Sequence, residues 1–289
     1  MIPSHKDTEF IKQKTLNLGE HLKILDQPLV MAILNLSPDS FYKTPTNKYT
    51  PDLEKQIIER IIELRPYCEI LDLGAVSTRP GTKGIPIKEE ANLLKPVLQI
   101  LRREFPDLPL SVDTWQSEIA KMAVAEGAVM INDISGGTLD EKMFRTIAGL
   151  KVPYVLMHMQ GSPETMQIKP HYHDVVNEIK LFFAQRIEEL KSLGVNDIIL
   201  DPGFGFGKTV EHNFLILNKL SSFRVFGLPI LAGLSRKSFI QKTLSVPAEE
   251  ALNGTTVLNT IALLQGADIL RVHDPREAKE VVRLLAKGC

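Results

Sequence analysis

The sequence predicts an α/β protein: a (β/α)8 barrel, or TIM barrel, preceded by a short N-terminal β-hairpin. Eight strand-length apolar runs recur along the 289 residues, and each is followed by a segment of helical periodicity. Continuous apolar strands that alternate with helices are typical of a parallel sheet covered on both faces. Eight such units need about 250 residues, and the carboxyl ends of their strands build the active site. The polar residues at which the runs stop are therefore site candidates: Asn35, Asp72, Asp113, Asn132, His158, Asp201, Ser235 and Arg271.

Residues 1–28 precede the first barrel strand and form an N-terminal extension. Within it, the stretches TLNL at 15–18 and HLKI at 21–24 alternate apolar and polar residues on either side of Gly19-Glu20. Alternation around such a turn predicts a β-hairpin. We expect the hairpin to close the amino-terminal mouth of a single barrel domain that spans residues 29–289.

Helical periodicity follows the strands. In DLEKQIIERIIELR we expect an amphipathic helix with Ile57, Ile58, Ile61 and Ile62 on one face. Gly127 is a stop signal for a helix that begins near Trp115. The predicted helices span residues 52–65, 88–104, 115–126, 140–149, 174–193, 210–220, 253–265 and 275–286.

Two long connections, residues 35–51 and 74–87, leave the carboxyl ends of the first two barrel strands. Loops longer than about 12 residues are uncommon in compact domains unless they are functional. Both are candidates for lids that close over a substrate.

Composition limits the kind of partner. The formal net charge is −1, whereas nucleic-acid and membrane-surface binding need a basic excess. Cys68 and Cys289 match no disulfide or metal-site spacing, and no apolar run is long enough to span a bilayer. We expect a cytoplasmic protein that binds small molecules, and neither nucleic acid nor membrane.

Three further features have a less specific meaning. The stretch GFGFGKT at 203–209 resembles a phosphate loop but has Pro202 where that motif needs glycine, so its glycines more simply allow a close approach to a ligand. His171 and His173 lack the spacing of a metal site. Lys237 fits either a Schiff-base lysine or a cation that binds an anion or a ring.

Eight motifs, one for each strand, together resemble the dihydropteroate synthase family of pterin-binding barrels, over about Val30 to Leu285. They are ILNLSPDSF at 33–41, LDLGAVSTRPG at 71–81, SVDTW at 111–115, INDISGG at 131–137, LMHMQGSPETM at 156–166, IILDPGFGFGKT at 198–209, GLSRKSF at 233–239 and ILRVHD at 269–274.

The resemblance implies an alkylation. The amine of 4-aminobenzoate would attack the methylene carbon of 6-hydroxymethyl-7,8-dihydropterin diphosphate, and diphosphate would leave. The products would be 7,8-dihydropteroate and diphosphate. The resemblance also implies a homodimer formed through the last helices and sensitivity to sulfonamides, which imitate 4-aminobenzoate.

The resemblance also assigns roles to residues. Asp113, Asn132, Asp201 and Lys237 would hold the pterin, with Met157 in the apolar floor. Oxygen acceptors suit the amino and N–H donors of the ring. The catalytic residues would be Lys237, Arg271, Asp113 and Asp201.

The remaining implied contacts concern the diphosphate and the amine. Arg271 and His273 would bind the ring and the diphosphate, and Asn35 would contact Mg²⁺, which usually keeps several waters. The 4-aminobenzoate site would be formed by Phe41, Thr78, Arg79, Pro80, Phe206, Ser235 and Ser238.

The chain departs from the usual family pattern in both long loops. Lys43 stands where an acid is common, and Ala75 and Val76 replace glycine and glutamate. Both changes fall in the long loops that would close over 4-aminobenzoate, and not in the pterin pocket. Three alternatives stay open: a non-catalytic pterin-binding homologue, a pterin-dependent methyltransferase of the same barrel group, and an aldolase that uses Lys237.

Overall fold

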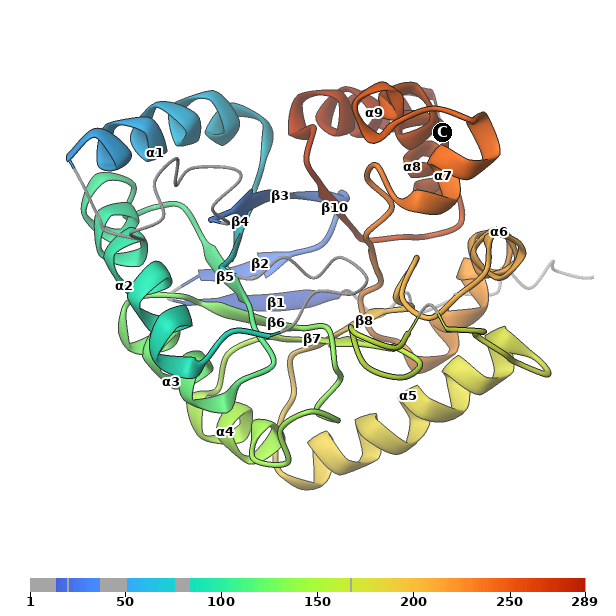
Figure 1. Ribbon diagram of the computed structural model, residues 1–289, viewed down its shortest axis with the longest axis horizontal. Coiled ribbons are helices and arrows are strands. Elements are labelled where there is room, and N and C mark those ends of the chain that lie inside the picture. The colour runs from blue at the N-terminus through green and yellow to red at the C-terminus, as the bar shows by residue number, and fades with distance from the viewer. Residues whose placement is uncertain (1–13, 20, 37–50, 76–83, 167, 289) are drawn as a thin grey trace, which may run out of the picture.

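The computed structural model describes residues 14–19, 21–36, 51–75, 84–166 and 168–288 (Figure 1). Eight parallel strands form one sheet in the order β8-β7-β6-β5-β4-β3-β10-β9. A bridge between Leu200 and Ile230 joins the two ends of the sheet, so the barrel is nearly closed, and the predicted fold is confirmed. The strands are β3 (Leu29–Asn35), β4 (Ile70–Gly74), β5 (Leu110–Asp113), β6 (Met130–Asp133), β7 (Tyr154–Met157), β8 (Ile198–Asp201), β9 (Leu231–Ala232) and β10 (Ile269–Val272).

The barrel interior changes from apolar to polar along the strands. Near the amino-terminal end, the inward side chains form a fully buried apolar layer that includes Met31, Ile70, Met130, Val155 and Ile199. Side chains two residues apart on a strand share a face. The same inner faces of β4, β6 and β8 therefore carry Asp72, Asn132 and Asp201 above this layer. The apolar layer supports a polar mouth.

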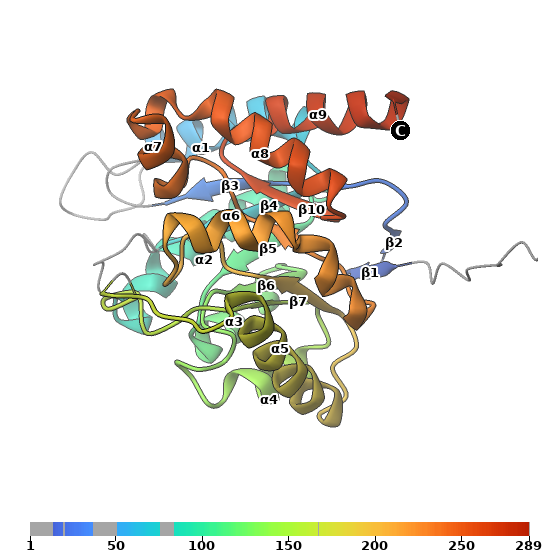
Figure 2. The ribbon, with the colours of Figure 1, turned by 90° about the vertical axis from the view of Figure 1, so that its right-hand side faces the viewer.

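The N-terminal hairpin is present as expected. Strand β1 (Thr15–Leu18) pairs antiparallel with β2 (His21–Ile24), and Figure 2 shows the pair at the amino-terminal end of the barrel. Leu16 and Leu18 are 0% and 7% exposed and pack into the inner apolar layer. Leu22 and Ile24 are exposed, so only one strand of the hairpin contributes to the core.

Helices cover the outside of the barrel (Figure 1). They are α1 (Pro51–Leu64), α2 (Ile87–Glu104), α3 (Ser117–Ala125), α4 (Met143–Leu150), α5 (Val175–Ser192), α6 (Val210–Asn218), α7 (Ser238–Leu244), α8 (Leu252–Leu264) and α9 (Pro275–Gly288). Short 3-10 turns occupy Arg65–Tyr67, Leu220–Phe226 and Ala248–Glu250. Among the described residues, no helix is both long and apolar enough to cross a membrane.

Two expectations about the helices were wrong. Ile57 and Ile61 are fully buried in α1, but Ile62 is 58% exposed, because a helical turn of 3.6 residues carries it off the face that meets the sheet. Helix α7 was not predicted: its seven residues begin in the polar stretch after Ser235 and are too few to show a clear period.

Strand register brings the polar strand ends together. Asn35 lies opposite Gly74, Gly74 opposite Asp113, and Asp113 opposite Asn132. Met157 lies opposite Asp201 in the same way. The carboxyl ends of β3 to β8 therefore form one continuous rim.

Candidate active site

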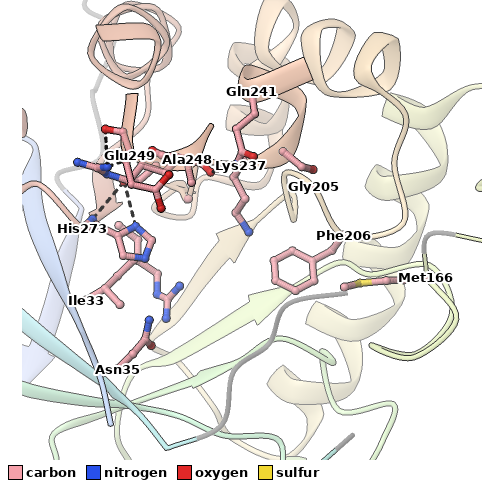
Figure 3. Close-up of a pocket in the computed structure, with 15 residues that line it drawn as sticks. Ile33, Asn35, Met166, Gly205, Phe206, Lys237, Gln241, Ala248, Glu249 and His273 are labelled. Atoms are coloured by element: carbon pink, nitrogen blue, oxygen red, sulfur yellow. Dashed lines mark hydrogen bonds between the residues drawn. The ribbon is translucent and has the colours of Figure 1, made fainter. Parts of the chain in front are cut away.

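A cavity of about 510 Å³ opens at the carboxyl ends of the barrel strands (Figure 3). Asn35 from β3 and Lys237 from the start of α7 point into it from different walls. The predicted site residues that line the cavity are Asn35, Phe206, Ser235, Lys237, Ser238, Arg271 and His273.

Arg271 connects the cavity to the polar interior. Its Nε donates to Asp72 Oδ2 at 2.6 Å, and its Nη2 donates to Asp113 Oδ2 at 2.7 Å. Asn132 Nδ2 donates to the same oxygen of Asp72 at 3.0 Å. One guanidinium therefore bridges β4 and β5 from β10, and its side chain is only 14% exposed.

The charge balance of this network affects Asp113. Burial raises the pKa of the Asp113 carboxyl, Arg271 opposes this rise, and the nearby Asp72 adds to it. The resulting pKa is about 7. Only Oδ2 of Asp113 meets Arg271; Oδ1 is buried and has no hydrogen-bond partner among the described residues. That oxygen can accept a hydrogen bond from a ligand.

Lys237 lies above the Phe206 ring, on the side of the barrel mouth opposite His273. Its Nζ is 4.0 Å from the centre of the Phe206 ring, within cation–π range (Figure 3). Gly205, with φ of +83°, allows this approach, because a Cβ there would lie 3.1 Å from the Lys237 side chain. Burial lowers the pKa of the Lys237 ammonium, Arg271 lowers it further, and Asp201 opposes the change. The resulting pKa is about 8.

Asp201 closes the base of the site beneath Lys237. Its Oδ1 accepts the backbone N–H of Gly203 at 2.8 Å, which fixes the turn after β8. Burial raises the pKa of this carboxyl, and the neighbouring lysine and arginine side chains lower it. Its Oδ2 lies beneath Gly233, a cavity residue that has no side chain to cover it.

The loop after β9 is held by Arg236, which adopts a left-handed backbone with φ of 53°. Its guanidinium makes two hydrogen bonds of 2.8 Å to Asp274 and two of 3.0 Å to the backbone carbonyls of Ala248 and Glu249. Such a paired fork is geometrically specific. It orients the neighbouring Lys237 toward the cavity.

Ser235 and His273 join the loop after β9 to the end of β10. Ser235 Oγ accepts the backbone N–H of His273 at 3.2 Å and lies 3.1 Å from its Nδ1. Both residues line the cavity, and Figure 3 shows His273 on the wall opposite Phe206. The last two barrel strands therefore contribute a common polar wall.

Lys208 and His158 are buried behind the barrel mouth, where they contact each other and do not line the cavity. Lys208 is 3% exposed, and its Nζ lies 3.1 Å from His158 Nδ1 and donates to the backbone carbonyls of His158 and Phe206. Burial lowers the pKa of Lys208 to about 7 and that of His158 to about 2. His158, a strand-end candidate, does not line the cavity; it anchors the turn that carries Phe206.

The remaining predicted residues fall into two groups. Asp113, Asn132, Met157 and Asp201 lie just beneath the cavity and are 2–7% exposed. Met157 packs with Phe206 and Met166 in a small apolar cluster. Phe41, Thr78, Arg79 and Pro80, together with Lys43 and Val76, lie outside the described residues.

Asp72 was recognised as a strand end but received no role from its motif. The structure places it between Arg271 and Asn132, two predicted pterin contacts. The position of Asp72 at the end of a strand was enough to predict that it lies near the site, because the carboxyl ends of neighbouring barrel strands meet at one rim.

Asn35 is the expected magnesium contact, and the surroundings fit that assignment. Among the described residues, no group of three or more histidines, cysteines or carboxylates could hold a metal ion. Asn35 lines the cavity, and its side-chain amide includes an oxygen, a hard ligand that suits Mg²⁺ when phosphate oxygens and waters complete its shell.

Comparison with known proteins shows which family the chain resembles. Residues 31–273 match the family model described as "Pterin binding enzyme". The dihydropteroate synthase of Synechocystis sp. is 39% identical over 258 residues, which cover 88% of each chain. That of Escherichia coli is 39% identical over 264 residues, covering 90% of this chain and 92% of the relative.

Solved structures agree in fold. Yersinia pestis dihydropteroate synthase in complex with a sulfonamide drug has a TM-score of 0.86 and 36% identity, over 95% of this chain and 98% of that one. Xanthomonas albilineans dihydropteroate synthase with 4-aminobenzoic acid has a TM-score of 0.86 and 35% identity, over 96% and 98%. The chain therefore belongs to the dihydropteroate synthase family of pterin-binding enzymes.

Proposed function

We propose that this protein is a transferase that joins 4-aminobenzoate to 6-hydroxymethyl-7,8-dihydropterin diphosphate. A C–N bond forms between the amine and the methylene carbon, and the C–O bond to diphosphate breaks. Diphosphate takes the electron pair, the amine loses a proton, and 7,8-dihydropteroate results. The observation that carries this proposal is the meeting of buried carboxylates, cations and an aromatic ring at one barrel mouth, in a chain of this family.

The buried half of the site suits a flat heterocycle. Asp113, Asn132 and Asp201 offer oxygen acceptors to the amino and N–H groups of a pterin. Lys237 offers an ammonium donor at the edge of the same space. Met157, in its apolar cluster with Phe206, supplies a surface for the face of the ring.

The outer half of the site suits the diphosphate. Arg271 and His273 line the cavity on the β10 side, and Asn35 faces it from β3. Preorganised cations stabilise the charge that develops on a leaving group. Asn35 would hold Mg²⁺, and the ion supplies further charge neutralisation when it is bound.

The amine enters beside Phe206. This ring, 6% exposed and fixed under Lys237, forms an apolar wall for an aromatic substrate. Ser235 and Ser238 give that wall a polar margin. Exclusion of water by the ring and the substrate protects the electrophilic methylene carbon from hydrolysis.

Isotope-labelled 4-aminobenzoate tests the reaction. Incubation with the pterin diphosphate and Mg²⁺ should yield a product whose mass carries the label, and Lys237→Ala should abolish it while its thermal unfolding stays cooperative. Methyl transfer from methyltetrahydrofolate to a corrinoid protein without labelled product would favour the methyltransferase. Borohydride trapping of a carbonyl substrate on Lys237 would favour the aldolase.

We also propose a cytoplasmic homodimer that associates through α8 and α9. These helices expose the large apolar side chains Val257, Leu264 and Leu284, at 51%, 61% and 72%. Contiguous exposed apolar surface is typical of association sites. Sedimentation equilibrium should give twice the chain mass, and Leu264→Asp should give the single mass; a wild-type monomer at all concentrations would contradict the dimer.

A further inference from the structure

Arg271 stands between the cavity and the pterin-binding acceptors. The cavity wall includes Arg271 but not Asp113, which lies behind it and accepts a hydrogen bond from its Nη2. A heterocycle that hydrogen bonds to both oxygens of Asp113 must therefore displace this guanidinium nitrogen from Oδ2. The site in this state is closed by one of its own predicted contact residues.

Displacing Arg271 from Asp113 would be costly if Asp113 were its only carboxylate partner. A buried guanidinium without a carboxylate partner is strongly destabilising. Arg271, however, is held by a second carboxylate through a different nitrogen: its Nε donates to Asp72. Asp72 is 0% exposed, does not line the cavity, and also accepts from Asn132.

Asp113 and Asp72 therefore differ in whether they can exchange a hydrogen bond to Arg271 for one to a ligand. Each keeps a buried Oδ1 without a hydrogen-bond partner among the described residues, but Asp113 is 7% exposed and holds only Arg271 on its Oδ2, whereas the Oδ2 of Asp72 holds both Arg271 and Asn132. Asp72 has no exposed surface and can reach the ligand only through its two partners. We propose that Asp72 is a positioning residue that keeps Arg271 paired and oriented while Asp113 exchanges the guanidinium for the pterin ring. This inference rests on the proposed function of the site.

A double-mutant cycle tests the role of Asp72. Asp72→Asn keeps the shape but removes the charge, and should lower kcat/KM for the pterin diphosphate by about 10- to 100-fold, as expected for a charged hydrogen bond. If Asp72 acts through Arg271, the same change in Arg271→Met should alter kcat/KM by less than about threefold. Equal effects in both backgrounds would show that Asp72 acts elsewhere and would overturn the proposal.

Asp133→Asn is a matched control. Asp133 is also 0% exposed at the end of β6, but it accepts from the Tyr154 hydroxyl at 2.6 Å and the Ser135 backbone at 2.7 Å. Its loss should lower the melting temperature and leave kcat/KM within about threefold of wild type. A drop as large as that of Asp72→Asn would mean that any buried charge has this effect, and would overturn the specific role.

A spectroscopic measurement on wild-type protein avoids the risk that Asp72→Asn fails to fold. The ¹⁵N-bound Nε proton of Arg271, identified by its loss in Arg271→Met, should be protected from exchange and stay protected when the pterin diphosphate binds. Loss of protection on binding would mean that Arg271 leaves Asp72 and would overturn the inference. This readout needs binding only, so wild-type protein that binds but forms no dihydropteroate would contradict the proposed function and not the positioning role.

Discussion

The charge of Lys237 should set the alkaline limit of activity. Burial and the neighbouring Arg271 lower the pKa of Lys237 from an ordinary value of 10.5 to about 8, although Asp201 opposes the change. The ammonium is therefore lost as pH rises through about 8, more than two pH units earlier than in an exposed lysine. A neutral amine donates a weaker hydrogen bond to the pterin and no longer balances Asp201.

The size of the effect follows from this pKa. With a pKa near 8, about 0.9 of the enzyme carries the ammonium at pH 7, about 0.5 at pH 8 and about 0.1 at pH 9. If only the charged form is productive, kcat/KM should fall about tenfold between pH 7 and pH 9. In Lys237→Arg the guanidinium stays charged throughout, so the alkaline limb should disappear whatever the absolute activity of the variant.

Coupled detection of released diphosphate, at saturating 4-aminobenzoate and varied pterin diphosphate, measures kcat/KM from pH 6 to pH 10. Circular dichroism at each pH shows whether the fold persists. Lys208, whose pKa burial lowers to about 7, is a second lysine among the described residues that could titrate in this range, and Lys208→Met should keep the limb near pH 8. A wild-type profile level to pH 10, or an unchanged limb in Lys237→Arg, would refute the assignment.

Three further changes test separate parts of the site. Asn35→Ala, or removal of Mg²⁺, should weaken calorimetric binding of the pterin diphosphate but not of the pterin alcohol; equal losses for both would contradict the metal role. Phe206→Ala should raise the KM for 4-aminobenzoate by about three- to tenfold and leave pterin binding unchanged, whereas a change confined to pterin binding would place this ring elsewhere. Gly203→Ala should lower the free energy of unfolding by about 3 kcal/mol or more, since φ is +71° and the new Cβ would lie 2.0 Å from the His158 carbonyl oxygen. Gly194→Ala, at φ of +84° with nothing within 4 Å, should cost only about 1–2 kcal/mol in the same denaturant titration, and equal costs would refute the steric argument.

The fold was predictable because the barrel strands are mostly buried on both faces. Residues such as those of β5 to β8 are all buried, so their sequences read as continuous apolar runs that end at a polar rim residue. Helix α7 and the exposed Ile62 escaped prediction, because seven residues contain fewer than two helical turns and a local pattern does not show which edge of an apolar face meets solvent.

The position of the described candidate residues in the barrel was predictable, but the hydrogen bonds between them were not. The strand rule and the family motifs brought Asp113, Arg271 and Lys237 to the correct end of the barrel. The pairing of Arg271 with Asp72 joins positions 199 residues apart, and no local pattern contains it. The rule also placed His158 at the rim, where its ring instead meets the buried Lys208.

Amine-dependent diphosphate release tests the central claim most directly. Purified protein with the pterin diphosphate and Mg²⁺ should release little diphosphate alone, and one equivalent for each 7,8-dihydropteroate formed once 4-aminobenzoate is added. Tight binding of the pterin diphosphate, with no release on adding the amine, would contradict the synthase assignment and identify a non-catalytic pterin-binding homologue.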